Sequence, residues 1–101
     1  MAMSNQKRAE MVALVVEINR ATGNPDGIFN ADMSSPIKYN IGTYDCTMTN
    51  AGYELVRITT QSGGERTIFF AKTSRELYAL ARAFLEGIEL AKASNGHGLP
   101  G

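Results

Sequence analysis

Apolar side chains recur at helical spacing near the start of the chain. The apolar residues are Met11, Leu14, Val15 and Ile18, and charged residues surround them. Steps of three and four residues are typical of a helix that buries one face. Ser4 suits the capping position of such a helix, and Gly23 suits the left-handed conformation that ends one. The pattern therefore predicts a helix from Ser4 to Thr22, followed by a turn at residues 24–27.

Residues 37–72 have the composition of β-strands. This stretch is rich in Ile, Thr, Tyr, Val and Phe, which favour extended chain. Two turn signals interrupt it, Asn50-Ala51-Gly52 and Ser62-Gly63-Gly64. The segment therefore predicts a meander of three antiparallel strands. Gly42 interrupts the first strand, where we expect a bulge or a close approach of backbones, because a glycine packs nothing inside a strand.

A second helix is indicated by a capping box followed by an apolar stripe. In Thr73-Ser74-Arg75-Glu76, the Thr and Glu side chains can satisfy each other's backbone amides at the start of a helix. The apolar stripe that follows comprises Leu77, Leu80, Ala81, Phe84, Ile88 and Ala91. We predict a helix that packs on the sheet and ends at Ala93. Residues 94–101 contain three glycines and a proline, which predicts a flexible tail.

The order helix, three strands, helix predicts one α+β domain over residues 1–93, with a three-stranded antiparallel sheet flanked by an N-terminal and a C-terminal helix. A chain of 101 residues has the size of a single domain. Its composition, 44% apolar and 20% charged, is that of a folded chain. The segment 28–36 has no periodicity and is predicted to be a loop whose role stays open.

Alternation in the third strand places large apolar side chains on both faces of the predicted sheet. Thr67, Phe69 and Ala71 would face one way, and Ile68 and Phe70 the other. Two helices normally cover one face only. We therefore expect a second copy of the chain to cover the other face, giving a homodimer or larger homo-oligomer; in the alternative, the loop at 28–36 covers it. The expected interface residues are Tyr53, Leu55 and Phe69.

Charge and cysteine content narrow the classes of partner. Ten Lys and Arg balance ten Asp and Glu, so no overall field attracts nucleic acid. The single cysteine cannot close an intramolecular disulfide, and residues 1–6 lack the apolar core of a secretory signal. The apolar stretch at 11–16 is far shorter than the roughly 20 residues that cross a bilayer. We expect a cytoplasmic protein with no membrane partner.

No group of side chains predicts a catalytic, cofactor or metal site. His97 lies in the predicted tail, where nothing holds it as closely as catalysis requires. Cys46 has no adjacent cation to lower its thiol pKa, so we expect a small, partly buried apolar group. Glu86 and Glu89 are expected on the solvent face of the second helix. The sequence therefore predicts a protein that is not an enzyme and carries no cofactor.

Nucleic-acid binding is the main alternative function. The predicted element order is that of double-stranded-RNA-binding domains, which read helix shape and phosphates, although only two cations begin the second helix. A single-strand platform would need exposed rings flanked by cations. The available rings are Tyr39, Tyr44, Tyr53 and Phe69. The cations expected to meet nucleic acid are Arg57, Arg66, Lys72 and Arg75. In a further alternative, the same cations hold a small anion such as a nucleotide at an oligomer interface.

Four short segments resemble a class of small, uncharacterised phage and prophage proteins. They are Gly52-Tyr53-Glu54-Leu55, Ser62-Gly63-Gly64, Thr73-Ser74-Arg75-Glu76-Leu77-Tyr78 and Ala83-Phe84-Leu85-Glu86-Gly87. The resemblance spans residues 52–87 and implies a phage or mobile-element setting, but no activity and no site residues. With the two-sided sheet, it leads us to expect a non-enzymatic phage-type accessory protein that binds a host or phage protein in the host cytoplasm.

Overall fold

The computed structural model describes residues 4–25, 27–28 and 38–96. Its elements are α1 (Asn5–Ala21), β1 (Tyr44–Met48), β2 (Tyr53–Ile58), β3 (Glu65–Ala71) and α2 (Ser74–Gly96). The three strands form one antiparallel sheet in the order β1-β2-β3, which confirms the predicted α+β fold. The predicted loop at 28–36, except Ile28, lies outside the described residues, as do Asp26 and His97.

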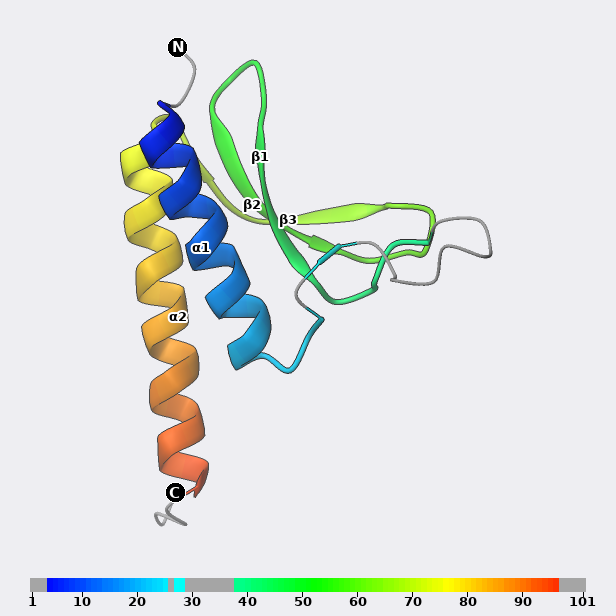
Figure 1. Cartoon of the computed structure of the whole chain (residues 1–101), viewed down its shortest axis with the longest axis vertical. Coiled ribbons are helices and arrows are strands. Elements are labelled where there is room, and N and C mark those ends of the chain that lie inside the picture. Colours follow the sequence, from blue (N-terminus) through cyan, green and yellow to red (C-terminus); the bar gives the residue numbers. More distant parts are fainter. Residues whose placement is uncertain (1–3, 26, 29–37, 97–101) are drawn as a thin grey trace.

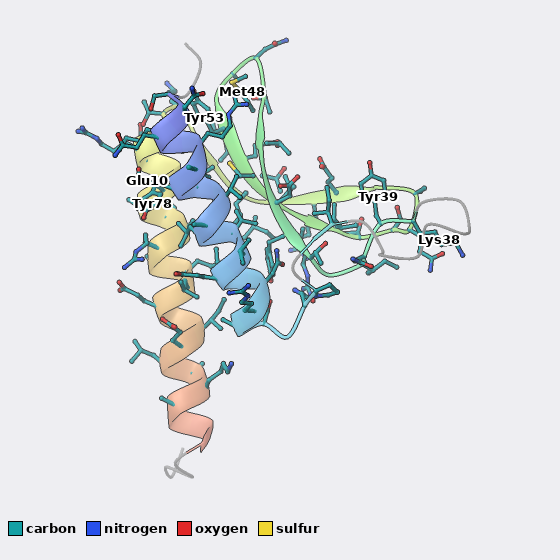
Figure 2. All side chains as sticks on the ribbon, viewed as in Figure 1. Glu10, Lys38, Tyr39, Met48, Tyr53 and Tyr78 are labelled. Atoms are coloured by element: carbon teal, nitrogen blue, oxygen red, sulfur yellow. The ribbon has the colours of Figure 1, made fainter. Side chains whose placement is uncertain are left out.

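The two helices lie side by side along one side of the sheet and run in the same direction (Figure 1). α1 contacts β1, whereas α2 contacts β2 and β3, so together they cover one face. The core between the two layers consists of Met11, Leu14, Val15, Ile18, Tyr44, Tyr53, Leu55, Ala71, Leu77, Ala81 and Leu85. Figure 2 places Tyr53 and Met48 at the end of the sheet where both helices begin, and Tyr39 and Lys38 at the far end.

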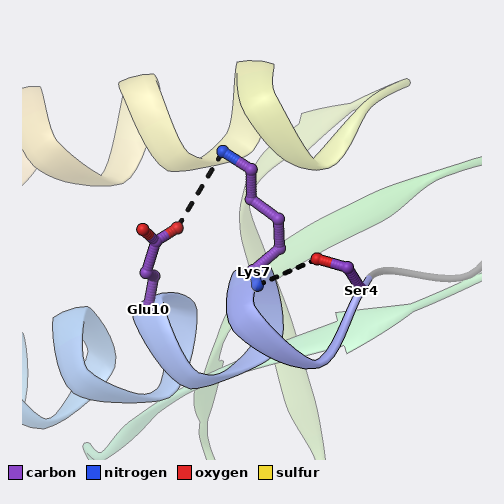
Figure 3. Close-up of polar contacts among 3 residues, drawn as sticks. All are labelled: Ser4, Lys7 and Glu10. Atoms are coloured by element: carbon purple, nitrogen blue, oxygen red, sulfur yellow. Dashed lines mark hydrogen bonds and ion pairs between the residues drawn. The ribbon is translucent and has the colours of Figure 1, made fainter.

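α1 forms where the apolar pattern predicts it. Ser4 caps the helix, because its Oγ accepts a hydrogen bond of 3.1 Å from the backbone N–H of Lys7. Lys7 Nζ also lies 3.9 Å from Glu10 Oε2 in an exposed ion pair (Figure 3), which contributes only a few tenths of a kcal/mol. Gly23 has φ of +79°, which confirms its left-handed position after the helix.

The turn between β1 and β2 depends on a glycine. Thr49 N–H donates to the Gly52 carbonyl at 2.7 Å, and Thr49 Oγ1 accepts from the N–H of Gly52 at 3.1 Å. A Cβ at Gly52 would collide with the carbonyl oxygen of Ala71. Gly42, predicted inside the first strand, instead precedes β1 with φ of +96°. The strand starts later than predicted because this left-handed residue bends the chain before Tyr44.

A bulge in β3 breaks the predicted alternation. Leu55 pairs with Phe69 and Val56 pairs with Thr67, so Ile68 is an extra residue between the two pairs. Leu55 and Val56 point to opposite faces, and their partners must do the same. Thr67 and Phe69 therefore do not share a face, contrary to the prediction. The bulge lets Ile68 and Phe69 both pack against the core.

The residues expected to form an exposed interface lie under the helices instead. Tyr53 and Leu55 are buried in the core, and Phe69 packs against it with its ring centre 5.5 Å from that of Phe84 on α2. The physical reason is the bulge, which aims Phe69 toward α2. Tyr53 and Leu55 thus give almost no free surface to a partner, and Phe69 is half-buried.

The opposite face of the sheet is covered in part by the chain itself. Val56 and Ile58 alternate with Leu55, so they point away from the helices. Each is nevertheless only 1% exposed in the single chain. Phe70 is the large apolar residue of β3 that stays exposed there. Self-association is therefore not needed to cover Val56 and Ile58 on this face of the sheet.

α2 begins at the predicted capping box. Thr73 Oγ1 accepts from the N–H of Glu76 and donates to its Oε1, both at 3.1 Å. The helix continues to Gly96, beyond the predicted end at Ala93. Within the described ranges, no helix is both long enough and apolar enough to cross a membrane.

Candidate functional site

Asn19 on α1 hydrogen-bonds to both backbone groups of Tyr44 at the edge of the sheet. β1 is an edge strand, because it pairs only with β2. Asn19 Oδ1 accepts from Tyr44 N–H at 2.7 Å, and Asn19 Nδ2 donates to the Tyr44 carbonyl at 3.1 Å. The amide thus offers the same donor and acceptor as a neighbouring strand. The sequence prediction missed Asn19, although its position four residues after Val15, on the buried face, was a signal.

Beyond Tyr44, the backbone of β1 faces outward at two more residues. On the β2 side, the Thr43 carbonyl accepts from Ile58 N–H, and Thr49 N–H donates to the Gly52 carbonyl. Because these directions alternate along a strand, Cys46 and Met48 point their N–H and C=O groups away from β2. The Asp45 carboxylate accepts from the N–H of Cys46. The backbone groups of Met48 have no partner among the described residues, so the edge is open there.

A groove runs between α1 and this open edge, and we call it the α1–β1 groove. Two adjoining hollows of about 250 Å³ and 220 Å³ form it, and both reach Val12 and Cys46. Val12 is 58% exposed on the helix side, and Met48 is 59% exposed on the strand side. Large apolar side chains beside an open strand edge form a surface suited to covering by a protein.

Cys46 lines the groove as a protonated thiol. Burial and the neighbouring Asp45 carboxylate raise the pKa of Cys46 to about 11. Because the thiolate is the reactive form, this thiol is a weak nucleophile near neutral pH. Burial also raises the pKa of the Asp45 carboxyl, against the hydrogen bond from Cys46 N–H, which lowers it. The half-buried position of Cys46 agrees with its prediction as a partly buried packing group.

Of the four cations predicted to contact an anion, the structure brings two together. Arg57 on β2 lies directly opposite Arg66 on β3. Lys72 and Arg75 lie at the other end of β3, where α2 begins. About 20 Å of strand separates Arg66 from Lys72, at about 3.3 Å per residue. The four cations therefore form two separate groups.

The rings predicted for a single-strand platform are mostly packed inside the protein. Tyr44 and Tyr53 are buried, and Phe69 meets Phe84 edge to face. Tyr39 lies over the β2–β3 turn, where a Cβ on Gly63 would come within 2.7 Å of its ring. These rings do not present a row of free faces on which bases could stack.

A further cleft of about 360 Å³ lies between the β1–β2 turn and the start of α2, with Lys72 at its margin. The capping box already engages Glu76 N–H there. Glu86 and Glu89 are exposed on α2. In the part of the chain that the structure describes, no three His, Cys, Asp or Glu residues gather as a metal site would need.

Comparison with known proteins finds no family model, no curated protein and no solved structure that matches this chain. Two features of the structure bear on function. The α1–β1 groove can accept apolar side chains and an added strand, and the opposed arginines can accept an anion.

Proposed function

We propose that this chain acts by binding a protein partner, with the α1–β1 groove as its docking site and with no catalysis of its own. The observation that carries the proposal is the exposure of Val12 (58%) and Met48 (59%) on the two sides of the groove. Covering such side chains is favourable by about 25 cal/mol per Å² of apolar surface. The protonated Cys46 thiol suits a packed contact better than a reaction.

The partner that we propose first is a second copy of the chain, so that the protein is a homodimer. Met48 offers one donor and one acceptor at the edge of β1. A two-fold axis beside Met48 would let two copies exchange these hydrogen bonds as antiparallel strands. Asn19 already occupies the edge at Tyr44, which confines the pairing to the Met48 end. This interface replaces the expected one on the sheet face, where Val56 and Ile58 are already buried.

The resemblance to phage and prophage proteins supports a role for this dimer as an accessory protein. Its further partner would be a host or phage protein in the host cytoplasm, where a chain with a single cysteine stays reduced. Nucleic-acid binding has less support, because the predicted rings are packed and the predicted cations lie in two groups.

Sedimentation velocity from low to high micromolar concentration tests the proposal. The wild-type chain should shift from monomer to dimer as its concentration rises. Val12→Glu should remain monomeric, because dimerisation would take the added carboxylate out of water in the groove. Leu90→Glu is the matched control, since Leu90 is an exposed apolar residue (69%) on α2 and does not line the groove. A wild-type monomer at high micromolar concentration, or an equal loss of dimer in Leu90→Glu, would contradict the proposal.

A further inference from the structure

Two arginines face each other across the β2–β3 pair. Arg57 lies opposite Arg66 in the register, and side chains so placed have Cβ atoms about 5 Å apart. No carboxylate of the described residues forms an ion pair with either guanidinium. The adjacent Glu65 pairs with Ile58, so it points to the opposite face of the sheet. Two like-charged residues thus occupy facing positions on adjacent strands, and neither has an ion-pair partner among the described residues.

Arg57 is held in place without the use of its terminal nitrogens. Its Nε donates to the Gly42 carbonyl at 3.2 Å, and its guanidinium carbon lies 5.5 Å from the centre of the Tyr44 ring. The Gly42 carbonyl also accepts from Asn24 Nδ2 at 2.7 Å, which fixes this acceptor. The Nη groups of Arg57 make no hydrogen bond to the described residues. A guanidinium fixed at one edge and free at the other is preorganised for a ligand.

Arg66 provides the second guanidinium and is unconstrained. Its side chain is exposed, and it makes no hydrogen bond, ion pair or ring contact in the described part of the chain. Bringing its guanidinium toward that of Arg57 costs repulsion in the empty protein, because the two residues are direct cross-strand partners. A shared anion between the two side chains would turn this repulsion into attraction.

We propose that Arg57 and Arg66 together bind one phosphate group of a phosphomonoester. Guanidinium groups donate paired N–H groups to phosphate oxygens, and the two negative charges of a monoester match the two positive charges. A nucleic acid fits less well, because Lys72 and Arg75 lie at the far end of β3 and no continuous row of cations follows successive phosphodiesters. The site uses neither Val12 nor Met48, so it is independent of dimerisation.

Calorimetric titration with inorganic phosphate, at ionic strength held constant with sodium chloride, tests this site. The wild-type chain should bind one phosphate with millimolar affinity. Arg66→Gln should bind at least about tenfold more weakly, because charge-assisted hydrogen bonds are lost. The affinity of Arg66→Lys for phosphate should be intermediate, since lysine keeps the charge but lacks the paired N–H donors of the guanidinium. Circular dichroism checks that both variants fold. If Arg66→Gln is unfolded, the comparison of Arg66→Lys with the wild type is the test.

Arg75→Gln is the matched control, because it removes an exposed arginine at the other end of β3. It should bind phosphate as the wild type does. An oligonucleotide without terminal phosphates should not compete with phosphate. The proposal is overturned if the wild type does not bind phosphate, if Arg75→Gln weakens binding as much as Arg66→Gln, or if the oligonucleotide binds more tightly than phosphate.

Discussion

Replacing Asn19 by alanine should destabilise the protein far more than an ordinary polar substitution. Asn19 is 1% exposed, and its amide makes both hydrogen bonds to the backbone of Tyr44. In Asn19→Ala, the Tyr44 N–H and C=O would lose their partners while α1 still covers them. The edge of β1 would then carry two buried, unsatisfied polar groups.

The loss of stability in Asn19→Ala follows from the unsatisfied N–H and C=O groups of Tyr44. Each buried polar group left without a partner costs about 1–3 kcal/mol. A water molecule that entered the space of the lost amide would recover part of this cost, so we expect a loss of about 2–4 kcal/mol in the free energy of unfolding. Domains of this size are stable by only about 5–15 kcal/mol. The melting temperature should fall by about 8–32 °C, at about 4–8 °C per kcal/mol.

Asn19→Asp tests the two hydrogen bonds of the Asn19 amide separately. The carboxylate could still accept from Tyr44 N–H but would repel the Tyr44 carbonyl, whereas the protonated acid could donate to it. Burial should raise the pKa of this carboxyl above its unfolded value of about 3.9. Its stabilising effect is therefore present below that value and is lost as the pH rises through the folded pKa. Asn19→Asp should gain stability relative to Asn19→Ala as the pH falls.

Urea unfolding of both variants, with Asn5→Ala as the exposed control, measures these effects. Asn5→Ala should change the free energy of unfolding by less than about 0.5 kcal/mol. If Asn19→Ala were equally mild, or if Asn19→Asp followed Asn19→Ala at every pH, the two hydrogen bonds to Tyr44 would not hold the edge as described.

Three further predictions concern single positions. Cys46 should react slowly with iodoacetamide near neutral pH, and rapid alkylation of the folded chain in mass spectrometry would refute this. Because its thiol pKa is raised, the free energy of unfolding should fall between pH 9.0 and about 11, where the unfolded chain loses the proton first. Gly52→Ala should cost about 1–3 kcal/mol in urea unfolding, because the new Cβ meets the Ala71 carbonyl, and a neutral result would mean that the turn moves aside. Arg66→Glu should raise the free energy of unfolding by about 0.2–1 kcal/mol at low salt by facing Arg57 with an opposite charge; a loss of stability would contradict the pairing.

The parts of the fold that could be predicted are those set by local chemistry. Ser4 and Gly23 mark the ends of the first helix, and Thr73 with Glu76 marks the start of the second. In each case, the decisive interaction joins residues that are neighbours in the chain, so the sequence pattern contains it. The composition of residues 37–72 indicated strands for the same reason.

Features that depend on pairing between distant residues could not be predicted. The extra residue Ile68 appears only once β2 and β3 are in register, and it decides which face Phe69 occupies. Asn19 meets Tyr44, 25 residues away, so its role needs α1 beside β1. The same holds for the α1–β1 groove, because Val12 and Met48 become one surface only when the helix lies along the strand.

Amide hydrogen exchange at Met48, measured at low and high micromolar concentration, tests the proposed dimer most directly. Tyr44 provides an internal control on the same strand edge, because Asn19 protects its N–H in each single chain. We predict that the Met48 amide exchanges quickly in the dilute protein and becomes protected in the concentrated protein, while the Tyr44 amide is protected in both. Equal exchange at Met48 at both concentrations would contradict docking of a second copy at this edge.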